Sequence, residues 1–145
     1  MKKDNTKIAV NTFNWGPCLI KLSILDDFRK ILLDEAKKTE MDFSDKLAGQ
    51  IAKERGYTQK QREIIIPHLS PYLGVYDEWY QRYTNKKYKH KPEYALTALW
   101  CNFQRQYEFN PPHDHDGKLS FVIYLSIPDK LKEENEAYKG KSCGP

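Results

Sequence analysis

The chain is poor in cysteine, and it has no apolar run as long as a signal peptide or a membrane span. Its three cysteines, Cys18, Cys101 and Cys143, are far apart and include no Cys-x-x-Cys pair. This cysteine usage argues against a disulfide framework and is typical of a reducing compartment. We therefore expect a cytoplasmic protein without a membrane partner.

The chain also lacks a large excess of charge of one sign. Its 145 residues carry a net charge of +4, and 39% of them are hydrophobic, which is enough for one ordered domain over residues 1–145. The most basic stretch, NKKYKHK at 85–91, is either a solvated linker or a phosphate-contacting patch. Because the overall charge is mild, we favour the linker and do not expect a nucleic-acid partner.

The order of the expected elements indicates the fold class. Apolar residues at helical spacing predict helices over residues 23–38, 42–56, 58–66 and 71–85. Alternating apolar and polar residues predict strands over residues 18–24, 94–109 and 119–128. The charged segment 129–145 is expected to be extended or briefly helical. Residues 1–90 thus supply one strand and the helices, residues 91–145 supply the later strands, and this order favours an α+β domain.

Two local signals delimit the third predicted helix. Thr58 followed by Gln61 has the spacing of a capping box, in which each residue satisfies a backbone N–H group at the start of a helix. Pro67 has no backbone N–H and its ring crowds the preceding turn, so we expect it to end or kink the helix.

Histidine is scarce as well, and two of the four histidines stand in one short segment, NPPHDHDG at 110–117. In an extended backbone, residues two apart point the same way, so His113 and His115 would face one side. Two imidazoles there can bind one divalent transition metal, although a third ligand must come from elsewhere. A polar turn, with a stiff Pro-Pro start and an Asp-Gly end, is the other interpretation.

Residues 98–128, ALWCNFQRQYEFNPPHDHDGKLSFVIYLSIP, resemble the iron(II)- and 2-oxoglutarate-dependent oxygenases. The resemblance is to a branch of that family frequent in phages and marine bacteria. In that branch a Trp-x-Asn strand precedes an Asn-Pro-Pro-His-x-His turn and an LSFVIYL-x-IP strand. The segment KLAGQIAKE at 46–54 is similar to the helical lead-in of the same branch.

The resemblance implies a fold and a chemistry. The fold is a double-stranded β-helix, a jelly-roll-like sheet covered by an N-terminal helical layer. The activity is hydroxylation of a C–H bond by Fe(II), with 2-oxoglutarate as co-substrate and ascorbate as a supporting reductant. His113 and His115 match the metal-ligand positions, and Asn102 and Tyr124 are candidates for hydrogen bonds to the co-substrate. A phage-encoded protein of this kind would act in the host cytoplasm.

The sequence departs from the family pattern at two points. The family's first ligand pair is His-x-Asp/Glu, whereas His113 is followed by His115. After Ser120 the sequence contains no His and no Arg, so the family's distal His and the Arg that binds 2-oxoglutarate have no counterpart. We therefore expect an incomplete β-helix that lacks its C-terminal part, with that part or a second copy of the chain as a partner.

A second class of function fits the same residues. In this alternative the chain is a non-catalytic β-sandwich module that binds a ligand or a protein, and its His pair is structural. The substrate of an oxygenase is not readable from the sequence, because substrate-binding loops diverge within one fold.

Overall fold

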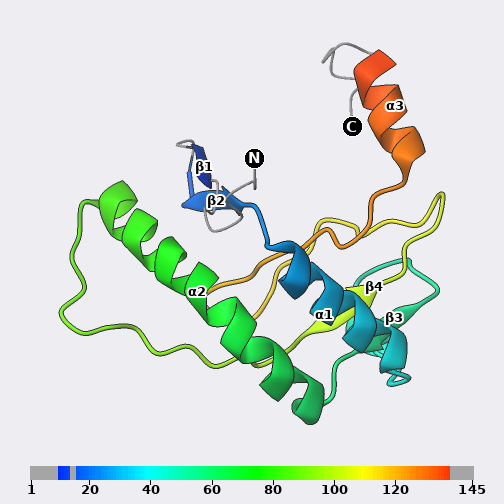
Figure 1. The fold of residues 1–145 in the computed structure, drawn as a ribbon, viewed down its shortest axis with the longest axis horizontal. Coiled ribbons are helices and arrows are strands. Elements are labelled where there is room, and N and C mark those ends of the chain that lie inside the picture. The colour runs from blue at the N-terminus through cyan, green and yellow to red at the C-terminus, as the bar shows by residue number, and fades with distance from the viewer. Residues whose placement is uncertain (1–9, 14–15, 138–145) are drawn as a thin grey trace, which may run out of the picture. The chain divides into compact units, whose positions relative to one another are not determined.

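The computed structural model describes residues 10–13 and 16–137 of the chain. They belong to two compact units, one ending at His113 and the other beginning at Asp114. The helices of the described residues are α1 (Asp26–Lys38), a 3-10 turn (Ser44–Lys46), α2 (Gln59–Thr84) and α3 (Asp129–Ala137). The strands are β1 (Val10–Phe13), β2 (Leu19–Leu22), β3 (Glu54–Gly56) and β4 (Trp100–Asn102) (Figure 1). Helices and small antiparallel sheets occur together, as in an α+β protein.

Two short antiparallel sheets lie in the first unit. Strands β1 and β2 pair with Val10 opposite Leu22, and strands β3 and β4 pair with Glu54 opposite Asn102. The chain beyond β4 stays beside the β3 region, because the Gln50 N–H donates to the Phe109 carbonyl at 2.8 Å. This pairing brings the segment that leads to the histidines next to a residue 59 positions earlier.

Helices α1 and α2 lie side by side and enclose much of the core (Figure 1). The ring of Phe28 on α1 lies 5.6 Å from the ring of Tyr72 on α2, and the Tyr72 hydroxyl accepts a hydrogen bond from the Leu25 N–H at 2.9 Å. Among the residues whose burial is described, the buried hydrophobic ones are Phe28, Leu32, Ala36, Ile51, Tyr57, Ile65, Leu69 and Tyr72. Burial of each large side chain among them stabilises the fold by about 1.5–3 kcal/mol.

The capping box at the start of α2 is confirmed. The Thr58 hydroxyl accepts a hydrogen bond from the Gln61 N–H at 3.3 Å, and the Gln61 side-chain oxygen accepts one from the Thr58 N–H at 3.0 Å. These contacts satisfy two backbone donors that the first turn of a helix leaves unpaired.

The prediction that the helix stops at Pro67 was wrong, because α2 continues to Thr84 and joins the two helices predicted on either side. Pro67 and Pro71 both lie on the exposed side of α2. Water can therefore reach the carbonyl groups that lose a helical N–H partner, which lowers the cost of each proline. Among the described residues, α2 included, no helix is both long and apolar enough to cross a membrane.

The prediction of a helix over residues 42–56 was also wrong. The segment contains the 3-10 turn at Ser44–Lys46 and then strand β3. Gly49 and Gly56 weaken helix formation there. Pairing with β4 supplies backbone hydrogen bonds to the segment, and this long-range pairing cannot be predicted from local sequence spacing. Gly56 also packs closely, since a Cβ at this position would lie 2.5 Å from the Met41 methyl carbon.

The two long strands predicted in the second half are much shorter or missing. Of residues 94–109 only Trp100–Asn102 form a strand, and residues 119–128 contain none. A strand requires a partner along its whole length, and β3 offers β4 a partner over three residues. The predicted strand over 18–24 is confirmed as β2. Of the two conformations expected for the charged segment, extended or briefly helical, the described residues adopt the helical one as α3. Cys143 and the end of the charged segment lie outside the described residues.

Candidate functional site

The two histidines of the NPPHDHDG segment are both exposed. His113 ends the first unit, and its ring nitrogen Nδ1 lies 2.7 Å from the carbonyl oxygen of Pro111. Metal-binding histidines commonly hold their second ring nitrogen against a backbone carbonyl in this way. His115 belongs to the second unit, together with Tyr124, whose side chain is 75% exposed.

An iron site of the kind that the resemblance implies needs three protein ligands on one face of the metal. In the described part of the chain, no group of three or more His, Cys, Asp or Glu side chains is placed to hold a metal ion. The residues that the structure describes therefore offer the two predicted imidazoles but not the complete ligand set, and we assign no reaction step to such a metal.

Asn102, the predicted co-substrate residue in the first unit, lies in a different polar cluster. Its register partner across the β3–β4 ladder is Glu54, which has no exposed surface. Neither carboxylate oxygen of Glu54 has a hydrogen-bond partner, and the buried side-chain oxygen of Asn102 has none either. Buried polar atoms are nearly always paired, so a cluster of three unpaired acceptor atoms is unusual.

Asn110, the first residue of the NPPHDHDG segment, joins this cluster through Gly49. A Cβ at Gly49 would lie 2.5 Å from the Asn110 side-chain oxygen and 2.8 Å from Oε1 of Glu54. The two oxygens thus converge on the space that a larger residue at position 49 would fill. Asn110 is exposed, so this edge of the cluster reaches the surface. We call Glu54, Asn102 and Asn110 the acceptor cluster.

The surroundings of the acceptor cluster are negative. Burial raises the pKa of Glu54 above its usual value, and the nearby carboxylates of Asp42 and Glu108 raise it further. Those two groups favour their charged forms: hydrogen bonds from Ser44 lower the pKa of Asp42, and backbone N–H groups of Arg105 and Ala52 lower that of Glu108.

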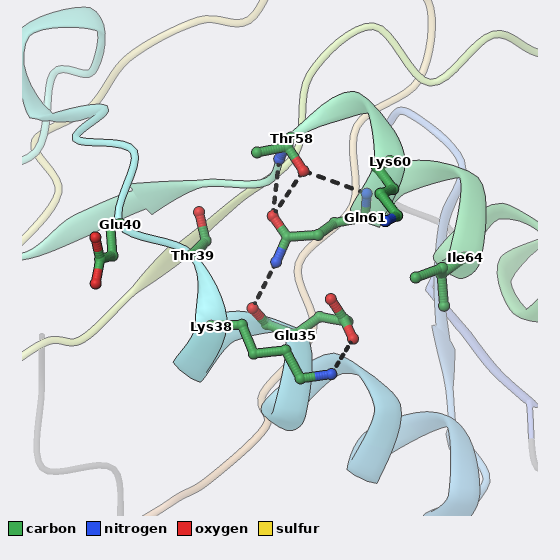
Figure 2. Close-up of a pocket in the computed structure, with 8 residues that line it drawn as sticks. All are labelled: Glu35, Lys38, Thr39, Glu40, Thr58, Lys60, Gln61 and Ile64. Atoms are coloured by element: carbon green, nitrogen blue, oxygen red, sulfur yellow. Dashed lines mark hydrogen bonds and ion pairs between the residues drawn. The ribbon is translucent and has the colours of Figure 1, made fainter.

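A separate hollow of 410 Å³ lies between the end of α1 and the start of α2. It is lined by Glu35, Lys38, Thr39, Glu40, Thr58, Lys60, Gln61 and Ile64 (Figure 2). Its main polar groups bind one another: Lys38 donates to Glu35 at 2.6 Å, and the Gln61 side chain donates to the Glu35 carbonyl at 2.9 Å. The Lys38 hydrogen bond holds the pKa of Glu35 below its usual value. The Gln61 bond joins the two helices, the Lys38 bond lies within α1, and both serve stability.

Sequence reasoning missed Glu54. It placed this residue in a helix, where its side chain would not be expected opposite Asn102. Its position becomes clear only from the pairing of residues 54–56 with residues 100–102. Local sequence patterns do not reveal that pairing.

Comparisons with known proteins add no relative. No protein-family model matches the chain, and neither a curated protein nor a solved structure matches it. The assignment of function therefore depends on the residues themselves.

Proposed function

We propose that this chain is the metal-binding part of an iron(II)- and 2-oxoglutarate-dependent oxygenase, with His113 and His115 as two of the metal ligands. The observation that carries the proposal is the His-x-His pair in NPPHDHDG, placed between a Trp-x-Asn strand and an apolar segment. The proposed fold is the double-stranded β-helix, with residues 100–102 in one of its first strands.

Two features of the described residues support this proposal. Trp100–Asn102 is a strand, as the resemblance requires. The His113 ring also contacts the Pro111 carbonyl, which fixes the ring relative to its own backbone and favours one tautomer. In the assembled enzyme, Fe(II) and O2 would supply the oxidising chemistry, and Asn102 and Tyr124 would donate hydrogen bonds that orient 2-oxoglutarate.

Metal binding can be tested without turnover. Co(II), a spectroscopic substitute for Fe(II), is titrated anaerobically into the wild-type chain and into the His113→Ala/His115→Ala variant. We expect the wild type to develop Co(II) absorption bands and the double variant to lose them. Asp114→Asn/Asp116→Asn is the matched control, since it keeps both imidazoles and should retain the bands. Equal binding by wild type and the His double variant would remove the assignment.

Turnover is tested separately, by measuring succinate released from 2-oxoglutarate with Fe(II) and ascorbate. Because two imidazoles hold iron weakly, we expect little succinate from this chain alone. Strong succinate release that depends on His113 would show that the chain completes its ligand set by itself.

A second candidate function is a non-catalytic binding module. The observation that favours it is the absence, in the residues that the structure describes, of a three-ligand group around the exposed histidines. Co(II) binding that is independent of both histidines, together with no succinate release, would give this candidate precedence.

A further inference from the structure

Three buried oxygens of the acceptor cluster, two on Glu54 and one on Asn102, have no hydrogen-bond donor among the described residues. A buried acceptor without a partner destabilises the folded state, and a carboxylate does so more than a neutral group. The Asn110 amide can turn so that its NH2 group faces Glu54, but Asn102 and the second Glu54 oxygen would still lack a donor. While Glu54 is charged, the cluster is therefore incomplete without a bound group.

Basic side chains next to Glu54 in the sequence do not neutralise it. Lys53 extends over the ring of Phe103, with its ammonium nitrogen 4.4 Å from the ring centre. Arg55 forms an ion pair with Asp42 at 3.2 Å. The Glu54 carboxylate thus lies in a negative environment without a cation from its own strand.

We propose that Glu54, Asn102 and Asn110 bind a hard divalent cation of the Ca²⁺, Mg²⁺ and Mn²⁺ class. Carboxylate and amide oxygens are the ligands that these ions prefer, and the ions complete their shells with water. The ion enters from the exposed Asn110 side, and the missing side chain at Gly49 leaves room between two of the oxygens. Asp42 and Glu108 add long-range attraction without being ligands.

This site is independent of the two histidines, and it shares only Asn102 with the proposed oxygenase site. Its ligands are all oxygens, whereas His113 and His115 offer imidazole nitrogens, which suit transition metals. Ca²⁺ distinguishes the two sites, because it selects oxygen ligands. With three protein ligands, one of them charged, we expect an affinity at the weak end of protein Ca²⁺ sites, with a Kd of about 0.1–1 mM.

The test uses the full chain, first stripped with EDTA and then given Ca²⁺, Mg²⁺ or Mn²⁺. The thermal midpoint is followed as a function of ion concentration, and bound Mn²⁺ is counted by electron paramagnetic resonance. Glu54→Gln keeps the shape of the side chain and removes its charge. Glu63→Gln, at an exposed position on α2, is the matched control, and His113→Ala/His115→Ala removes the other site.

We expect the wild type, Glu63→Gln and the His double variant to gain thermal stability with Ca²⁺ and to bind one Mn²⁺ at the cluster. Glu54→Gln should lose both responses. Gly49→Ala, which places a methyl group between the oxygens, should also weaken binding. The proposal is overturned if the wild type binds no ion and its midpoint does not move, because Glu54 would then be a buried neutral carboxyl group. It is equally overturned if Glu54→Gln responds like the wild type.

Discussion

Glu54 on β3 and Asn102 on β4 occupy opposite positions of one antiparallel ladder, and both carry buried side-chain oxygens without a hydrogen-bond partner. The carboxyl group of Glu54 therefore favours its neutral form when no cation is bound, in agreement with its raised pKa. The direction of this shift gives the stability of the chain a definite dependence on pH.

In the presence of a chelator, we expect Glu54→Gln to be more stable than the wild type near pH 7, by about 1–3 kcal/mol. A carboxyl group whose pKa is raised by folding stabilises the folded state below its unfolded pKa, and this contribution is lost as the pH rises through the folded pKa. The difference should therefore shrink toward about pH 4. Urea unfolding at a series of pH values measures it, and a difference that stays constant with pH would contradict the prediction.

Tyr57, which follows β3, is linked to α1 by a hydrogen bond, and loss of this bond should lower the free energy of unfolding. The side chain is 2% exposed, and its hydroxyl donates a hydrogen bond to the Leu32 carbonyl at 3.1 Å. Tyr57→Phe keeps the ring and loses this bond, so we expect a loss of about 1 kcal/mol in the free energy of unfolding. Tyr124→Phe, at a position that is 75% exposed, is the control and should change little. Equal effects in the two variants would contradict this role.

Because of the capping box, removal of the Thr58 hydroxyl at the start of α2 should lower the stability of the chain. Thr58→Ala removes the hydroxyl that accepts the Gln61 N–H, and we expect it to cost about 1 kcal/mol in chemical denaturation. Thr58→Ser keeps the hydroxyl and should retain most of the stability. A serine variant as unstable as the alanine variant would mean that the methyl group of Thr58 matters more than the cap.

Replacing Pro67 should stabilise the chain, whereas Thr58→Ala should destabilise it. It lies in the interior of α2 on the exposed side, where it removes one helical hydrogen bond. Pro67→Ala restores the N–H group, and we expect a gain of up to ~3 kcal/mol. Pro112→Ala, in a loop, is the control and should give no comparable gain. A destabilised Pro67→Ala variant would show that α2 needs the local geometry that the proline imposes.

The contrast between Thr58 and Pro67 shows how far the sequence predicts this fold. The capping box depends on residues three apart, so it could be found from the sequence. The effect of Pro67 depends on which side of α2 is covered, and that side is set by packing of Leu69 and Tyr72 against the rest of the unit. Proline does weaken a helix, as the sequence rule states, but the exposed position of Pro67 lowers the free-energy cost of the lost hydrogen bond.

The same distinction applies to the candidate sites. His113 and His115 were found because their signal is local. Glu54 was missed because its significance depends on Asn102 and Asn110, which β-pairing brings near it from about fifty residues away. Asn102 was predicted to bind a co-substrate, and the structure places its side-chain oxygen in the acceptor cluster. The predicted role of Asn102 toward 2-oxoglutarate remains a prediction.

The second unit carries an apolar segment whose alternating pattern predicted a strand. Residues 119–128 form no strand, and Val122 and Tyr124 are 79% and 75% exposed. A strand-forming segment with exposed apolar side chains is prone to pair with another chain. We therefore expect the wild-type chain to self-associate, with a sedimentation coefficient that rises with protein concentration.

Val122→Lys tests this interpretation, because a charge in the middle of the segment opposes strand pairing between chains. We expect the variant to sediment as a smaller species than the wild type at the same concentration. Gln106→Lys adds the same charge at an exposed position outside the segment and should behave like the wild type. If the wild type remains a monomer at every concentration, the prediction of self-association is wrong. If Gln106→Lys disperses the chain as well as Val122→Lys does, net charge controls association and the apolar segment does not.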